Sequence, residues 1–226
     1  MQEIYSQTQQ QSAVVSTNKV LKNTYMLLAM TMAVSAIACG ISMAIGLGRG
    51  PALIMNLVAL GLVWFALPRT ANSTSGIYVV FAFTALLGAS LGPTINHYLQ
   101  FSNGSQIVMQ ALGGTALVFF GLSAYVLTTR KDFSFMRGFL MTGLILVLVC
   151  ALGLIIAGFF GVQIAMAHLA ISGAIVLLMS GFILYDTSRI IHGGETNYVV
   201  ATVGLYLNIY NLFVSLLHII GATSDD

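Results

Sequence analysis

Residues 139–160 read FLMTGLILVLVCALGLIIAGFF, an apolar stretch that contains no charged side chain. A helix needs about 20 apolar residues to cross the ~30 Å hydrocarbon core of a bilayer, and this stretch has that length. The alternation of apolar and polar residues that is typical of an outer-membrane barrel is absent from it. The stretch therefore predicts a transmembrane α-helix.

The rest of the chain has the same character. Of its 226 residues, 58% are apolar and 6% are charged, and the mean hydropathy is +0.95. A soluble domain carries about 25% charged residues, so a water-facing surface cannot be built from this composition. The formal net charge of +2 excludes the clustered basic face of a nucleic-acid-binding protein. We predict an all-α integral membrane protein embedded in a lipid bilayer.

Seven apolar segments divide the chain into transmembrane spans joined by short polar connections. The expected spans cover residues 25–46, 52–68, 77–98, 107–128, 139–160, 164–190 and 199–220. The connections leave no room for an extramembrane catalytic domain. Residues 1–23 are polar and rich in Gln, Ser and Thr, which predicts a flexible tail. The predicted domains are this tail, a seven-helix transmembrane domain at 24–221 and a short tail at 222–226.

The basic residues indicate the orientation, because positively charged loops stay in the cytoplasm. With the amino end inside, seven spans place seven of the eight basic residues on the cytoplasmic side: Lys19, Lys22, Arg69, Arg130, Lys131, Arg137 and Arg189. Arg49 falls on the other side. We therefore expect a multi-pass membrane protein with a cytoplasmic amino end and a carboxyl end on the opposite side.

Small residues recur at four-residue spacing within several spans. They include Ala36 and Gly40, Gly88 and Gly92, and the series Gly153, Ala157 and Gly161. Such spacing lets helix backbones approach closely in lipid, so helix packing is the expected role. Gly92-Pro93 also leaves open a kink or a broken helix that frees carbonyl groups for an ion. Cys39 and Cys150 lie in apolar runs and are interpreted as packing residues.

Asp186 is the one acidic residue that falls inside a span. An ionised carboxylate in hydrocarbon costs several kcal/mol unless it is paired or hydrated, so such an acid indicates a functional site. Arg189 lies three residues further on the same helix face and is a candidate charge partner. Two interpretations stay open, a functional acid and a plain ion pair near the cytoplasmic end of the helix.

The seventh span is more polar than the others. Tyr206, Asn208, Tyr210 and Asn211 occupy two of its turns, and Asn208 is expected near the membrane midplane. Amides at that depth do not face lipid, so this helix is expected to be surrounded by other helices or to line a wet cavity. Interhelical hydrogen bonding is the simpler alternative.

Two further site hypotheses are weak. His97, His168 and His218 map near the outer ends of their helices, but no carboxylate accompanies them, so no metal site is predicted. The segment around Ser123 resembles the nucleophile segment of rhomboid-type intramembrane proteases. His168 lies near the opposite end of its helix, about 15 Å or more away along the membrane normal, so it cannot serve as the base. No catalytic residue and no cofactor are predicted.

The carboxyl-terminal third carries the most specific signature. From Phe182 the chain reads FILYDTSRIIHGGETNYVVATVGLYLNIYNLF, and earlier segments include STNKVLKNTY, FAFTALLGASLGP and QALGGTALVFFGLSAYVLTTRKDFSF. These segments resemble the Bax inhibitor-1-like family in its bacterial YccA branch, over nearly the whole chain. The resemblance implies seven helices with the seventh enclosed by the other six.

The resemblance also implies two alternative functions. In calcium-leak members of the family, two aspartates share a proton and form a pH-dependent gate. Asp186 matches the first aspartate, but Asn208 stands at the second position, and an amide cannot titrate. The YccA branch is instead associated with an FtsH-type ATP-dependent membrane protease. The resemblance therefore implies a non-enzymatic modulator of that protease, engaged through the amino-terminal tail with Lys19 and Lys22, and a calcium leak channel is the alternative.

Overall fold

The computed structural model describes residues 2–161 and 165–224, and every regular element within those ranges is a helix. Seven of the described helical segments are long and apolar enough to cross a membrane. They are Thr17–Ala44, Arg49–Thr70, Ser75–Tyr98, Gly104–Thr129, Ser134–Gly158, Met166–Ile191 and Tyr198–Thr223. The predicted all-α membrane class and its seven spans are confirmed. Most spans are a few residues longer than expected, because helical hydrogen bonds continue into the polar residues at the span ends.

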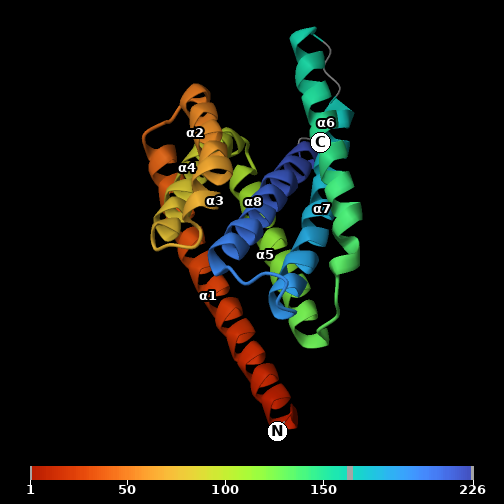
Figure 1. Cartoon of the computed structure of the whole chain (residues 1–226). Helices are drawn as coiled ribbons and strands as arrows, with labels where there is room; N and C mark the ends of the chain where they lie inside the picture. Colours follow the sequence, from red (N-terminus) through yellow and green to blue (C-terminus); the bar gives the residue numbers. More distant parts are fainter. Residues whose placement is uncertain (1, 162–164, 225–226) are drawn as a thin grey trace. The chain divides into compact units, whose positions relative to one another are not determined.

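The chain divides into two compact units, each described here by itself (Figure 1). Unit 1 comprises Met1–His97 and Ile190–Tyr206. It contains α1 (Gln2–Ala44), α2 (Arg49–Gly61), a π-helical segment (Leu62–Ala66), α3 (Leu67–Thr70), α4 (Ser75–Tyr98) and the beginning of α8 (Tyr198–Thr223). Unit 2 comprises Tyr98–Arg189 and Leu207–Asp226. It contains α5 (Gly104–Thr129), a 3-10 turn (Ser134–Met136), α6 (Arg137–Phe159), nearly all of α7 (Ala165–Ile191) and the rest of α8.

Helix α1 includes most of the tail expected at residues 1–23, because its backbone is helical from Gln2, and the flexibility of that tail stays a prediction. The sequence contains no Gly or Pro before Gly40, so nothing ends the helix once it has formed. Contacts within unit 1 also begin earlier than residue 24. The Thr17 hydroxyl lies 4.0 Å from where a β-carbon on Gly193 would stand, and the Thr24 carbonyl accepts a hydrogen bond from Thr202 at 3.3 Å.

Helices α1 and α4 pack closely through small residues. A β-carbon added to Gly88 would stand 2.6 Å from the Ser35 Cα, and one added to Gly92 would stand 2.8 Å from the Ser42 Cβ. The predicted packing role of the Gly88 and Gly92 pair is therefore confirmed. Helix α4 also continues through Pro93, so the alternative of a broken helix is wrong. The Asn96 amide donates to the Met43 carbonyl at 3.1 Å and ties the far ends of the two helices.

The π-helical segment before α3 follows from Pro68. Proline has no N–H, so the carbonyl four residues earlier, on Trp64, would lose its helical donor. The wider turn instead pairs the Leu67 N–H with the Leu62 carbonyl, five residues back. The Arg69 guanidinium donates to the Phe65 carbonyl at 2.6 Å. Side-chain and π-type hydrogen bonds thus keep the second span continuous across the proline.

Asn197 fixes the start of α8 within unit 1. Its side-chain oxygen accepts hydrogen bonds from the backbone N–H groups of Val199 at 2.9 Å and Val200 at 3.2 Å, which is the geometry of an N-cap. Its amide nitrogen donates to the Ala71 carbonyl at 2.9 Å and to the Asn72 side chain at 2.8 Å. One side chain therefore joins the α3–α4 connection to the α8 terminus.

Asn197→Ala is expected to lower the free energy of unfolding by about 2 kcal/mol, because it removes both the cap and the link to residues 71 and 72. Thermal unfolding of the detergent-solubilised protein measures the loss. Asn197→Ser is the matched control, since serine still caps the helix but is too short to reach Ala71. The serine variant should lose about half as much, and equal losses in the two variants would show that the link contributes nothing.

In unit 2, α6 and α7 pack through a reciprocal pair of contacts. A β-carbon on Gly143 of α6 would stand 2.6 Å from a methyl group of Leu178, and one on Gly181 of α7 would stand 2.6 Å from a methyl group of Leu140. Each leucine fills the space that the opposite glycine leaves open. The other face of α6 is different, since among the described atoms none lies within 4 Å of the β-carbon position on Gly153.

Candidate functional site

Helix α8 is the most buried of the spans found in the described residues. Half of its most apolar window is buried (50%), against 11% for the span that contains α6. This agrees with the expectation that the polar seventh span avoids lipid. Its buried polar side chains include Thr202, Asn208 and Ser215.

Asp186 and Asn208 meet within unit 2. The Asn208 amide nitrogen donates a hydrogen bond of 2.8 Å to the Asp186 Oδ2 atom. Asp186 lies one turn before the end of α7, and Asn208 lies near the middle of α8. From the sequence we predicted both residues as a site, but we expected them at different depths. That expectation assumed that the helices run parallel to each other. Figure 1 shows α8 running obliquely to α7, which brings the two side chains together.

This pair has the chemistry of an anchored carboxylate. A hydrogen bond to an ionised acceptor is stronger than one between neutral groups, so the amide is a suitable donor to a carboxylate at Asp186. The amide has no proton that it can exchange with the acid at physiological pH. A proton-sharing pair of carboxylates therefore cannot form here, whereas a carboxylate and an amide oxygen are ligands that suit a hard cation.

The residues after Asp186 perform structural roles that the sequence did not reveal. Thr187 is fully buried, and in the described part of the chain its hydroxyl has no hydrogen-bond partner. Ser188 accepts a hydrogen bond from the Phe133 N–H at 3.0 Å and donates to the Lys131 carbonyl at 3.3 Å. The Arg189 guanidinium lies 5.6 Å from the centre of the Tyr185 ring, a cation–π contact. Its predicted pairing with Asp186 stays a prediction.

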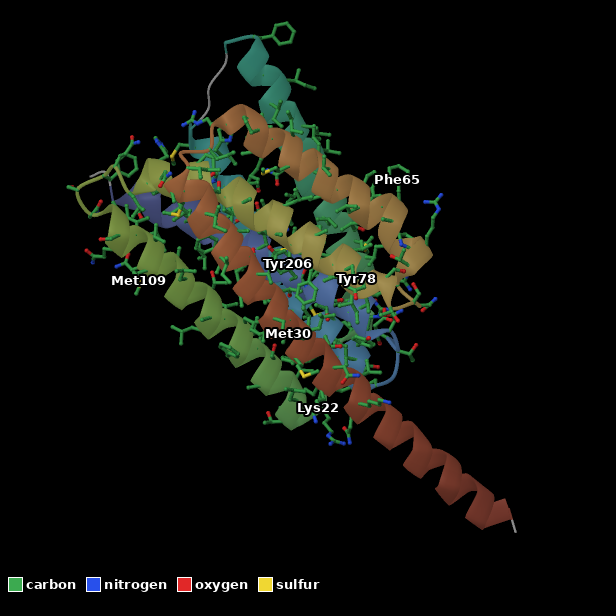
Figure 2. All side chains as sticks on the ribbon, turned by 90° about the vertical axis from the view of Figure 1, so that its left-hand side faces the viewer. Lys22, Met30, Phe65, Tyr78, Met109 and Tyr206 are labelled. Carbon is green, nitrogen blue, oxygen red and sulfur yellow. The ribbon has the colours of Figure 1, made fainter. Side chains whose placement is uncertain are left out.

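Other helices carry the remaining candidate residues Lys19, Lys22 and Ser123. Lys19 and Lys22 are exposed on α1, and Figure 2 labels Lys22 on that helix. Ser123 is buried in α5, and its hydroxyl has no partner among the described residues, whereas His168 is exposed. A serine nucleophile needs a base within hydrogen-bond reach, so this arrangement does not favour an intramembrane hydrolase.

A second polar cluster, in unit 1, was missed from the sequence. The Tyr206 hydroxyl shares a hydrogen bond of 2.7 Å with the Ser35 hydroxyl and donates to the Thr84 carbonyl at 3.3 Å. Its ring packs edge-on against Phe83, with 5.6 Å between ring centres. Figure 2 shows Tyr206 in the interior of the unit. The cluster joins α1, α4 and α8. In the sequence, only the polarity of the seventh span indicated that this helix makes polar contacts.

Tyr206→Phe is expected to lower the free energy of unfolding by about 1 kcal/mol, because the ring keeps its packing while the Ser35 hydroxyl loses its partner. Thermal unfolding in detergent measures this change. Tyr78→Phe is the matched control, since Tyr78 is 72% exposed on α4 and points outward in Figure 2. The control should unfold as the wild type does. A loss of the same size in both variants would contradict a role for the buried cluster.

Comparison with known proteins identifies the family. Residues 17–225 match the family described as "Inhibitor of apoptosis-promoting Bax1". The chain belongs to the Bax inhibitor-1-like family. The match begins at Thr17, within α1.

Several bacterial relatives cover nearly the whole chain of this Bax inhibitor-1-like protein. An uncharacterized membrane protein of Vibrio cholerae is 51% identical over 99% of this chain and 98% of its own length. The protein named "Modulator of FtsH protease YccA" in Escherichia coli is 50% identical over the full length of both chains. An uncharacterized protein of Pseudomonas aeruginosa is 46% identical over 92% of this chain and 90% of its own. The seven spans and this kinship identify a multi-pass inner-membrane protein.

Proposed function

We propose that this chain is a non-enzymatic inner-membrane protein that binds and modulates an FtsH-type ATP-dependent membrane protease. The observation that carries the proposal is the 50% identity to the Escherichia coli modulator of FtsH protease, over the full length of both chains. Sequences that similar share their fold and commonly share a partner. The name of that relative, a modulator, favours a regulator over an enzyme.

Contacts within each unit support a cytoplasmic amino end. In unit 1, Asn197 links the α7–α8 connection to Ala71, and Gly193 faces Thr17, so these segments lie on one side of that unit. In unit 2, Ser188 near the end of α7 binds the α5–α6 loop. These segments carry the basic residues other than Arg49. Positively charged loops stay in the cytoplasm, so we expect these segments of each unit on the cytoplasmic side and the carboxyl end in the periplasm.

The first turns of α1 are the segment that the protease would grip. They extend away from the other helices of unit 1 in both views (Figures 1 and 2). An isolated helix of about 15 residues is marginally stable in water, so unwinding it costs little. The exposed Lys19 and Lys22 stand where this segment meets the folded unit. An ATP-driven ring could therefore engage the segment before it meets packed structure.

Deletion of residues 2–16 tests this proposal without disturbing the contacts of Thr17 or Thr24. The truncated protein should have a longer lifetime than the full chain in cells with active protease, and both should be equally long-lived in cells without it. A chase experiment after translation arrest measures the lifetimes. Co-purification of the protease with the full chain tests binding separately. Unchanged lifetime together with absent co-purification would refute the proposal.

A pH-sensitive calcium leak is the second candidate function. The observation that favours it is the contact between Asp186 and Asn208, which sets a carboxylate and an amide side by side within the transmembrane helices. Calcium flux into proteoliposomes at acidic and neutral pH, compared with Asp186→Asn, tests this candidate. The substitution keeps the size of the side chain but removes its charge. Equal flux through both proteins would exclude Asp186 from any conduction mechanism.

A further inference from the structure

The loop between α5 and α6 is held in one conformation. It includes residues 130–136, at the lower end of α5 in Figure 1. Helix α5 ends at Arg130, which adopts left-handed backbone angles (φ 50°, ψ 29°). Ser188 then binds the backbone on both sides of Asp132, accepting from the Phe133 N–H at 3.0 Å and donating to the Lys131 carbonyl at 3.3 Å. Because Ser188 itself is buried, the loop is attached to the body of unit 2.

This loop concentrates positive charge. Residues 130–137 read RKDFSFMR, so three positive charges less one negative charge leave +2, the same as the formal charge of the whole chain. The carboxylate of Asp132 accepts a hydrogen bond from the Ser134 N–H at 2.8 Å. Lys131 lies 5.9 Å from the centre of the Tyr125 ring, and both Lys131 and Arg137 are exposed. The cations therefore stand on the outside of a fixed loop.

Aromatic rings lie directly beside these cations. The Phe133 ring is 6.2 Å from that of Tyr125 and 6.3 Å from that of Phe135, measured between ring centres. Phe135 is 79% exposed and Phe139 is 73% exposed. Both belong to the first two turns of the span Ser134–Gly158, and the ends of a span are expected where lipid headgroups meet acyl chains. Exposed rings at this level face lipid rather than water.

We propose that Lys131, Arg137, Phe135 and Phe139 form a binding site for an anionic phospholipid. The two cations bind the headgroup phosphate, and the two rings contact the acyl chains next to it. The loop presents its charges and its exposed rings within about two helical turns of each other at the end of a span. An anionic lipid offers the complementary pair, a phosphate joined to an apolar chain, whereas the acidic surface of a soluble protein offers only the charge.

Titration of the full chain with phosphatidylglycerol or phosphatidylcholine, followed by native mass spectrometry, tests this site. The wild type should bind phosphatidylglycerol more tightly. The double variant K131Q/R137Q should bind it roughly 30-fold more weakly, at about 1 kcal/mol for each basic residue near the surface. The variant K131R/R137K keeps both charges and should bind as the wild type does. Equal melting temperatures in phosphatidylcholine verify that the variants fold.

Three results would overturn the proposal. The first is an unchanged preference for phosphatidylglycerol in K131Q/R137Q. The second is an equal loss of affinity for phosphatidylglycerol in K19Q/K22Q, which removes two exposed cations from α1. That result would show that only the net charge of the protein matters. The third is full competition by soluble glycerol 3-phosphate, which lacks acyl chains. If K131Q/R137Q kept its lipid preference but no longer co-purified with the protease, the loop would be a protein contact instead.

Discussion

Gly88→Ala is expected to lower the free energy of unfolding by about 3 kcal/mol or more, although it adds a single methyl group. The new β-carbon would stand 2.6 Å from the Cα of Ser35 and still closer to the Ser35 carbonyl oxygen. Backbone atoms cannot rotate away as a side chain can, so α1 and α4 would have to separate. Ser35 also holds the Tyr206 hydroxyl, so the separation would break that hydrogen bond too.

Two matched variants separate this steric effect from a general effect of alanine. Gly40→Ala lies in α1 of the same unit, where none of the described atoms comes within 4 Å of the β-carbon position, so it should be neutral or slightly stabilising. In Gly143→Ala the new β-carbon would meet the end of the Leu178 side chain, which can move. Its loss of stability should therefore fall between those of Gly88→Ala and Gly40→Ala. Thermal unfolding ranks them, since 3 kcal/mol corresponds to roughly 6–12 °C. A Gly88 variant that melts with the Gly40 variant would disprove the close approach.

This ranking shows what the sequence could and could not predict about packing. Four-residue spacing of small residues identified a helix face at Gly88 and Gly92, and another at Ala36 and Gly40. It could not say which face meets a neighbouring helix. In the structure Gly88 touches Ser35, whereas in the described part of the chain nothing lies within 4 Å of the Gly40 position. Spacing within one helix carries no information about the position of the next helix.

Hydrophobicity predicted all seven spans because crossing lipid demands long apolar segments. At the amino end, polarity indicated a flexible tail, which stays a prediction, and the backbone is helical from Gln2. Polarity indicates burial rather than backbone conformation, whereas the absence of Gly and Pro indicates that a helix can continue. The π-helical turn before Pro68 was missed for a similar reason, because the sequence shows the proline but not how the chain accommodates it.

The candidate site was predicted as residues but not as a contact. Asp186 stood out because it is an acid within a span, and Asn208 because it is an amide in a polar helix. Their hydrogen bond depends on the tilt of α8, which no local pattern encodes. The role of Ser188 was not predicted. A serine near the end of a span is common, and the sequence does not show which loop it binds.

Asn208→Leu is expected to lower the free energy of unfolding by about 2 kcal/mol. The substitution keeps the volume of the side chain but removes the donor that lies 2.8 Å from the Asp186 carboxylate. A hydrogen bond to a charged group contributes about 1.5–3 kcal/mol, and the carboxylate would be left without it in a partly buried position. Asn211→Leu on the same helix is the matched control. Its amide donates to the Leu207 carbonyl of its own helix at 2.8 Å rather than to a neighbouring helix, so the loss in this variant should be small.

The double variant Asp186→Leu/Asn208→Leu tests whether the loss depends on the hydrogen bond between these two side chains. Replacing both partners by apolar groups of similar size can be nearly neutral, whereas removing one partner leaves the other uncompensated. The double variant should therefore be more stable than Asn208→Leu alone, which thermal unfolding in the same detergent measures. The contrary outcome is that the losses of Asp186→Leu and Asn208→Leu, each measured alone, add up to the loss of the double variant. In that case the carboxylate and the amide act independently, and their hydrogen bond does not link α7 to α8 in this part of the protein.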